Sequence, residues 1–292
     1  MRKSICYFIP LFFLSLLAAA GCRSAVATTT EVVAIQSNAL PVAPTDAAWD
    51  EAPEHPAKLL LQDLVEPRLM KATTDEVRVR AITNGNEVAF RLEWNDTTKN
   101  DLPGPARFLD ACAVQVPAKL EANVPDPQMG GQGKTVEITY WRADWQASVD
   151  GRPDALKEMY PNASIDGYPF EARSLEKGSA AQQEMATRYA PARAVGNRRV
   201  GPRETPVEDL IADGPGSLSP APPAGSKGKG AKSENGWSVV ITRKLPNGLA
   251  PGARTQVAFA VWEGGHNETG ARKMRTGWVP LLMKPMKGAE AK

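Results

Sequence analysis

The chain has 292 residues, of which 25 are Pro and 24 are Gly. Its hydrophobic content of 42% is enough for a folded core and excludes wholesale disorder. Lys and Arg total 35 against 33 Asp and Glu, so the net charge of +2 gives no general attraction to nucleic acid. So many structure-breaking residues argue against a helical bundle and favour short strands joined by turns.

Residues 1–21 have the pattern of an export signal. Arg2 and Lys3 precede an apolar run that is too short to span a bilayer comfortably, and small residues then lead to Cys22. This junction resembles a bacterial lipobox, in which the cysteine is lipidated and becomes the mature N-terminus. We therefore expect an exported protein on the periplasmic side, held at the membrane by a lipid on Cys22. An ordinary cleaved signal peptide is the alternative.

Alternating apolar and polar residues predict strands along much of the chain. Residues 76–94 indicate a β-hairpin, because two alternating segments flank Asn84-Gly85-Asn86, whose residue types suit a left-handed turn. Residues 180–189 are the main candidate for a helix. Further strands are predicted over residues 111–116, 135–141, 237–245, 255–262 and 277–283. The spacing favours a mainly β protein, an antiparallel β-sandwich with a few short helices and long loops.

The expected domain organisation is simple. Residues 22–39 form a tether and a first strand, and residues 40–287 form a single domain. Residues 213–235 contain almost no large apolar side chain, so we expect a flexible loop there. This loop interrupts the domain and does not separate two domains, because the few strands after it could not stand alone.

Most familiar catalytic and cofactor motifs are absent from the sequence. It contains no Cys-x-x-Cys-His for covalent haem, no P-loop and no paired-glycine dinucleotide fingerprint. The two histidines, His55 and His266, stand far apart, which disfavours zinc catalysis and a Ser-His-Asp triad. A hydrolase is therefore disfavoured, and we assign no catalytic residue; that the protein is not itself an enzyme is implied only by the resemblance described below.

Two loops carry side chains that suit a cofactor. Met129 lies in a glycine-rich segment that leads into a strand containing Tyr140 and Trp141, and a thioether there could be offered to a haem. The competing interpretation is a methionine that fills a gap in the core. A second loop, residues 263–278, contains nitrogen donors that include His266 and Lys273; its competing interpretation is a solvated charged loop.

At these loops the sequence resembles the haem b-binding γ subunits of ethylbenzene dehydrogenase and related dimethyl-sulfoxide-reductase-type molybdoenzymes. The resemblance covers most of residues 40–284 in the expected order. The matching stretches are residues 110–117, 129–146, 161–171, 236–240 and 257–264, together with Lys273 and Trp278.

The resemblance implies a β-sandwich that holds one non-covalent haem b with a Met and a Lys as axial iron ligands. By position these ligands are Met129 and Lys273. Tyr140, Trp141 and Trp262 are candidates to line the haem pocket, although such residues could equally be plain core. His266 is retained as the alternative second ligand, because imidazole is the better-known haem donor. Lys244 is a weaker competitor, and His55 is expected to be structural or exposed.

The resemblance also implies a function in electron transfer. With both axial positions filled, the iron would suit outer-sphere electron transfer better than substrate chemistry. The expected partners are a molybdopterin catalytic subunit and an iron–sulfur subunit, or a periplasmic cytochrome. The alternative function is a carbohydrate-binding β-sandwich surface lipoprotein without haem, because residues 46–52 resemble the opening of such modules and exposed Trp side chains could stack on sugars. A purely structural surface lipoprotein is a third possibility.

Overall fold

The computed structural model describes residues 29–153, 156–163, 176, 178–189, 192, 195–197, 199, 201, 203–246 and 248–285. The expected signal segment, the expected lipidation site Cys22 and most of the matching stretch at residues 161–171 lie outside these residues. Within the part that is described, no helix is both long enough and apolar enough to cross a membrane.

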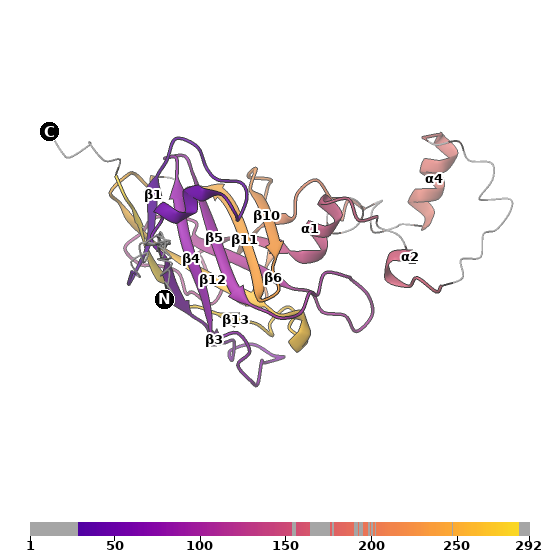
Figure 1. The fold of residues 1–292 in the computed structure, drawn as a ribbon, viewed down its shortest axis with the longest axis horizontal. Coiled ribbons are helices and arrows are strands. Elements are labelled where there is room, and N and C mark those ends of the chain that lie inside the picture. Colours follow the sequence, from indigo (N-terminus) through magenta and orange to yellow (C-terminus); the bar gives the residue numbers. More distant parts are fainter. Residues whose placement is uncertain are drawn as a thin grey trace, which may run out of the picture.

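Strands dominate the architecture, and helices are few and short (Figure 1). The strands are β1 Val32–Gln36, β2 His55–Lys58, β3 Leu60–Leu61, β4 Glu76–Thr83, β5 Glu87–Asn95, β6 Ala111–Pro117, β7 Val136–Arg142, β8 Val207–Ala212, β9 Ser219–Pro220, β10 Lys227–Lys232, β11 Gly236–Lys244, β12 Arg254–Trp262, β13 Met274–Arg275 and β14 Val279–Met283. The helices are η1 Ala47–Glu51, α1 Ala143–Val149, α2 Leu156–Met159, α4 Ala180–Tyr189 and η2 Gly264–His266.

The strands form two layers that share β12. Residues 254–257 of β12 pair with β14, whereas residues 258–262 pair with β6. The first layer has the order β10-β11-β5-β4-β1-β14-β12, and the second continues as β12-β6-β7-β8-β9, with β13 paired to β12 and β3 paired to β13. The fold is therefore the expected β-sandwich, with one correction: β1 runs parallel to both β4 and β14. The long connection after β1 makes the parallel pairing with β4 possible.

The predicted hairpin and helix are both present. In the turn between β4 and β5, the Asn84 side chain accepts hydrogen bonds from the backbone N–H groups of Asn86 and Glu87, at 3.0 and 2.8 Å. Gly85 has a φ of 91°, which a left-handed turn requires. Helix α4 matches residues 180–189, whereas α1 was not predicted.

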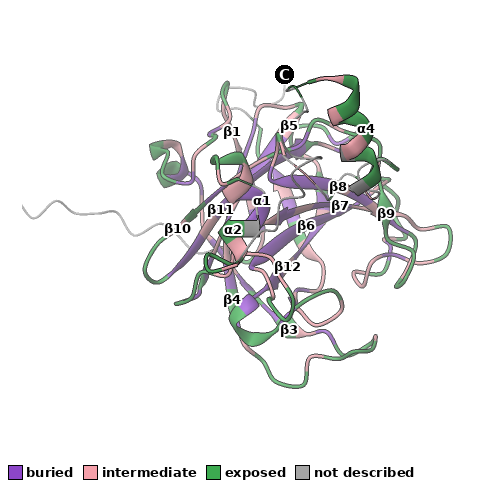
Figure 2. Ribbon diagram, turned by 90° about the vertical axis from the view of Figure 1, so that its right-hand side faces the viewer, coloured by how far each residue is buried: buried purple, intermediate pink, exposed green. Residues whose placement is uncertain are grey.

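The main core lies between the two layers, where the buried strands are purple in Figure 2. Phe90 of the first layer meets Phe259 of the second with ring centroids 6.1 Å apart, and Trp141 meets Trp237 at 5.1 Å. Both pairs are edge-to-face, an arrangement that adds about 0.5–1.5 kcal/mol beyond the burial of area. Cys112 is a free thiol in this core, and burial raises its pKa well above the ordinary value.

The structure corrects the expectation of a structureless loop over residues 213–235. This segment contains β9 and β10, and all six residues of β10 pair with β11. A Cβ atom on Gly230 would stand 2.3 Å from Cζ2 of Trp141, so the glycine makes room for the indole. The Gly230 N–H donates to Oε1 of Gln146 at 2.7 Å. The strand therefore depends on an apolar side chain from the opposite layer and not on apolar residues of its own.

Candidate functional site

A cavity of about 470 Å³ lies on the outer face of the second layer, away from the core between the layers. Strand register builds its floor: Ala260 stands opposite Ala113, and Ala113 stands opposite Tyr140. Ile138 and Leu210 form a neighbouring row that is apolar. Because small alanines occupy the centre of the floor and larger side chains surround them, the face is hollow and not filled.

Met129 enters this cavity from the loop between β6 and β7. Its φ of 74° is left-handed, which is uncommon for a residue with a side chain and costs about 1–3 kcal/mol. Two backbone hydrogen bonds hold the conformation: Gly214 N donates to Met129 O, and Gly130 N donates to Asp126 O, both at 2.8 Å. A Cβ on Gly130 would lie 2.5 Å from Lys134 O, so only glycine fits there. This strained backbone presents the thioether to the cavity.

Lys273 enters from the opposite side, in the loop just before β13. Its Nζ lies 4.0 Å from Sδ of Met129, although the two residues are 144 positions apart in sequence. The same Nζ stands 5.0 Å from the ring centroid of Trp262. Burial, and to a lesser degree the charge of Arg275, lower the pKa of Lys273 from 10.5 to about 8. The fold thus brings a thioether and a readily deprotonated amine together.

Four side chains hold the backbone of these two loops. Trp278 Nε1 donates to Pro125 O at 2.7 Å, and Gln115 Nε2 donates to Pro127 O at 2.9 Å. On the other side, Trp262 Nε1 donates to Gly270 O, and Gln62 Nε2 donates to Ala271 O, both at 3.0 Å. Sequence reasoning missed both glutamines. The only signal for Gln115 was a polar residue inside an otherwise apolar strand.

The charged side chains among the described residues that line the cavity are all cationic. Four cationic side chains line it, namely Arg142, Arg199, Lys273 and Arg275, and no Asp or Glu is among the described lining residues. The described part of the chain also holds no group of three or more His, Cys, Asp or Glu side chains that could bind a metal ion. An apolar cavity with a basic lining favours a largely apolar ligand that carries negative charge.

Tyr140 and Trp262 line this cavity, and their rings meet edge-to-face at 5.2 Å. The expectation that Trp141 lines it is wrong. Successive side chains of a strand point to opposite faces, so Trp141 lies in the core between the layers, where it is fully buried. Lys244 is exposed at the end of β11 in the first layer. His55 is buried and structural, with Nδ1 2.8 Å from Thr29 O.

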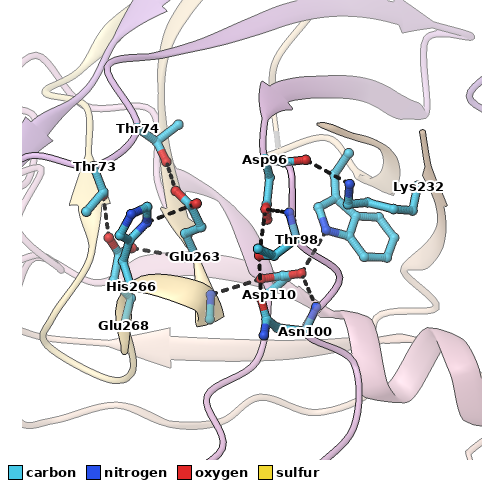
Figure 3. Close-up of polar contacts among 12 residues, drawn as sticks. Thr73, Thr74, Asp96, Thr98, Asn100, Asp110, Lys232, Glu263, His266 and Glu268 are labelled. Carbon is cyan, nitrogen blue, oxygen red and sulfur yellow. Dashed lines mark hydrogen bonds and ion pairs between the residues drawn. The ribbon is translucent and has the colours of Figure 1, made fainter. Parts of the chain in front are cut away.

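His266 does not line the cavity, and its Nδ1 lies 2.9 Å from Oε1 of Glu263 (Figure 3). Figure 3 shows the polar network that fixes this loop: Thr74 donates to Glu263, and Thr73 donates to Glu268. Glu268 also accepts from the backbone N–H of Glu263 at 3.0 Å. The imidazole therefore has a local partner, and its side chain is 53% exposed to solvent.

The segment that suggested sugar binding does not present an aromatic platform. Trp49 is fully buried in η1, and its Nε1 donates to Ala43 O at 3.0 Å. The carbohydrate-binding alternative therefore loses the exposed tryptophan that this segment was expected to supply.

The architecture is that of a β-sandwich with a ligand-sized cavity on the outer face of one layer. Residues 46–274 match the family described as ethylbenzene dehydrogenase, and the chain belongs to this family.

Two relatives cover most of the chain. A protein of Haloferax mediterranei described as a respiratory nitrate reductase heme subunit is 23% identical over 252 residues, which are 84% of this chain and 69% of the relative. The chlorate reductase subunit gamma of Ideonella dechloratans is 23% identical over 275 residues, covering 90% of each chain.

Among solved structures, a family 9 carbohydrate-binding module of Caldicellulosiruptor kristjanssonii in complex with cellotriose aligns with a TM-score of 0.44 at 8% identity. The alignment covers 89% of this chain and 97% of the module. The same kind of module in complex with glucose aligns with a TM-score of 0.38.

Proposed function

We propose that this protein is an exported electron-transfer subunit that binds one non-covalent haem b in the cavity, with Met129 and Lys273 as the axial iron ligands. The observation that carries the proposal is the approach of Met129 Sδ and Lys273 Nζ to 4.0 Å within an apolar, basic cavity. The membership of the ethylbenzene dehydrogenase family and the names of the two relatives support it.

The residues present fit a haem. The alanine floor leaves room for a flat macrocycle, and Tyr140, Ile138 and Trp262 offer apolar surface to it. The cationic lining matches the propionate carboxylates of haem. When bound, haem supplies a one-electron couple between ferric and ferrous iron. The thioether of Met129 is a soft ligand that favours ferrous iron and so raises the reduction potential.

Lys273 must be neutral to bind iron. Its pKa of about 8 means that giving up a proton costs far less than it would for an exposed lysine, whose pKa is near 10.4. If Met129 and Lys273 both held the iron, they would leave no position on it for oxygen or substrate. This arrangement supports electron transfer in preference to a bond-making reaction.

The proposed partners are a molybdopterin catalytic subunit and its iron–sulfur subunit, or a periplasmic cytochrome. The two relatives, named as subunits of a nitrate reductase and a chlorate reductase, support a partner of this kind. The proposed location is the periplasmic side of the membrane, with a lipid on Cys22 as the anchor; the support is the signal-like sequence of residues 1–22.

Pyridine haemochrome spectroscopy of the protein, purified after expression with added haem, tests the proposal. We expect a b-type spectrum with about one haem per chain, and a low-spin spectrum that is lost in both Met129→Leu and Lys273→Leu, because neither replacement can bind iron. His266→Ala is the matched control and should leave the spectrum unchanged. Absence of haem from the wild-type protein would reject the proposal. Loss of the low-spin spectrum in His266→Ala alone would show that the ligand assignment is wrong.

A further inference from the structure

One end of the cavity carries a cluster of charged side chains that axial coordination does not use. Arg142 and Arg199 line the cavity and also line an adjoining hollow of about 200 Å³, so they stand between the two spaces. Tyr140 lies at the same end, and its ring meets that of Trp145 edge-to-face at 5.6 Å.

Arg142 is held in a fixed orientation. Its Nη2 lies 2.6 Å from Oδ2 of Asp144, and its Nε donates to the other carboxylate oxygen. The guanidinium stacks over the ring of Trp145, 4.3 Å from the centroid. These contacts use one edge of the guanidinium. Its Nη1 has no hydrogen-bond partner among the residues that the structure describes.

Arg199 is held less tightly. Its Nε lies 2.8 Å from Oε2 of Glu208, and the arginine side chain is 44% exposed. Its terminal nitrogens have no hydrogen-bond partner among the residues that the structure describes, and the residue lines the cavity. A guanidinium with free N–H groups is well suited to a carboxylate, because the two groups form parallel hydrogen bonds.

A third arginine, Arg203, belongs to the same cluster. Three guanidinium groups, those of Arg142, Arg199 and Arg203, stand with two carboxylates, those of Asp144 and Glu208. The Arg203 guanidinium also packs over the Trp145 ring, 3.9 Å from its centroid. Burial and the nearby arginines lower the pKa of Arg203, and Glu208 acts against them.

We propose that Arg142 and Arg199 bind one propionate carboxylate of the porphyrin and so fix which edge of the macrocycle faces Trp145. This inference rests on the proposed function. Arg275, the remaining arginine of the lining, lies 3.4 Å from the Thr276 carbonyl oxygen and 4.0 Å from Asp63, and it is the rival partner that the test must distinguish.

The test compares haem with haem dimethyl ester, which lacks both carboxylate charges, in titrations of the full chain in one detergent. Wild-type protein should bind the diacid at least about tenfold more tightly than the ester, as expected for hydrogen bonds to a charged group. Arg199→Gln should remove most of this preference, with the affinity for the ester unchanged. Arg199→Lys should restore part of it, because the charge returns without the planar fork.

Arg254→Gln is the matched control, because Arg254 is an exposed arginine paired with Glu31 at a distant edge of the first layer. Arg254→Gln removes the same charge as Arg199→Gln, and this variant should keep the full preference for the diacid over the ester. Equal binding of diacid and ester by a wild-type protein with a normal low-spin spectrum would overturn this inference and leave the proposed function standing. Loss of the preference in Arg275→Gln but not in Arg199→Gln would also overturn it. A wild-type protein that binds neither compound would reject both proposals.

Discussion

Replacement of Gly230 by Ala should destabilise the sandwich, although it adds only one methyl group to a segment rich in Gly and Lys. The new Cβ would stand 2.3 Å from Cζ2 and 2.9 Å from Cε2 of Trp141. Trp141 is fully buried and packed against Trp237, so the indole cannot move aside freely. Overpacking of this kind costs about 1–3 kcal/mol. The lower entropy of the unfolded alanine chain offsets part of that, which leaves a net loss of about 1–2 kcal/mol.

Thermal unfolding followed by circular dichroism measures this loss. A domain of this size loses about 2–4 °C in melting temperature for each kcal/mol. Gly277→Ala is the control, because a Cβ at Gly277 meets no atom within 4 Å, and its melting temperature should stay at the wild-type value. If Gly230→Ala unfolds at the same temperature as Gly277→Ala, then β10 does not pack on Trp141 and the reasoning is refuted.

Three further predictions concern the cavity and the buried charges. Ala113→Leu should fill the cavity floor and reduce haem affinity at least about tenfold in a spectrophotometric titration, while normal affinity would show that haem binds elsewhere. Gln62→Leu removes the hydrogen bond to Ala271 O that holds the Lys273 loop, together with three bonds to the backbone of residues 64 and 65, so haem affinity should fall about fivefold and the melting temperature should fall as well; an unchanged affinity would exclude a positioning role. Burial raises the pKa of Asp110 from 3.8 to about 6, so between these two pH values the folded state holds a proton that the unfolded state has lost. The free energy of unfolding of the wild type relative to Asp110→Asn should therefore fall by about 2 kcal/mol between pH 4 and pH 6 in urea titrations, and a difference independent of pH would contradict this.

The strands could be predicted because apolar and polar residues alternate along them, and the apolar residues lie on the buried face. The hairpin of β4 and β5 shows this, since its alternating residues and its turn are both present as expected. Strand β10 could not be predicted in this way. Its Gly230 leaves the space that the Trp141 side chain occupies, and Trp141 belongs to the other layer. The parallel pairing of β1 was also out of reach, because no local pattern distinguishes parallel from antiparallel neighbours.

The site was predictable only in part. Met129 and Lys273 were named through a family resemblance, since nothing local indicates that residues 144 positions apart will meet. The prediction that Trp141 lines the cavity is wrong, although the alternation of side chains along the strand is sufficient to place Trp141 and Tyr140 on opposite faces. Gln62 and Gln115 contribute through bonds to distant carbonyl groups, which depend on the finished fold.

Strand β12 belongs to both layers of the sandwich and also lines the cavity. Phe259 faces the packing between the layers, while its neighbours Ala258 and Ala260 line the cavity. The same strand is hydrogen-bonded to β14 at one end and to β6 at the other. A denaturant that separates the layers must therefore also dismantle the ligand site, because β12 belongs to both. A molecule held in the cavity then protects the whole sandwich, including strands that it never touches.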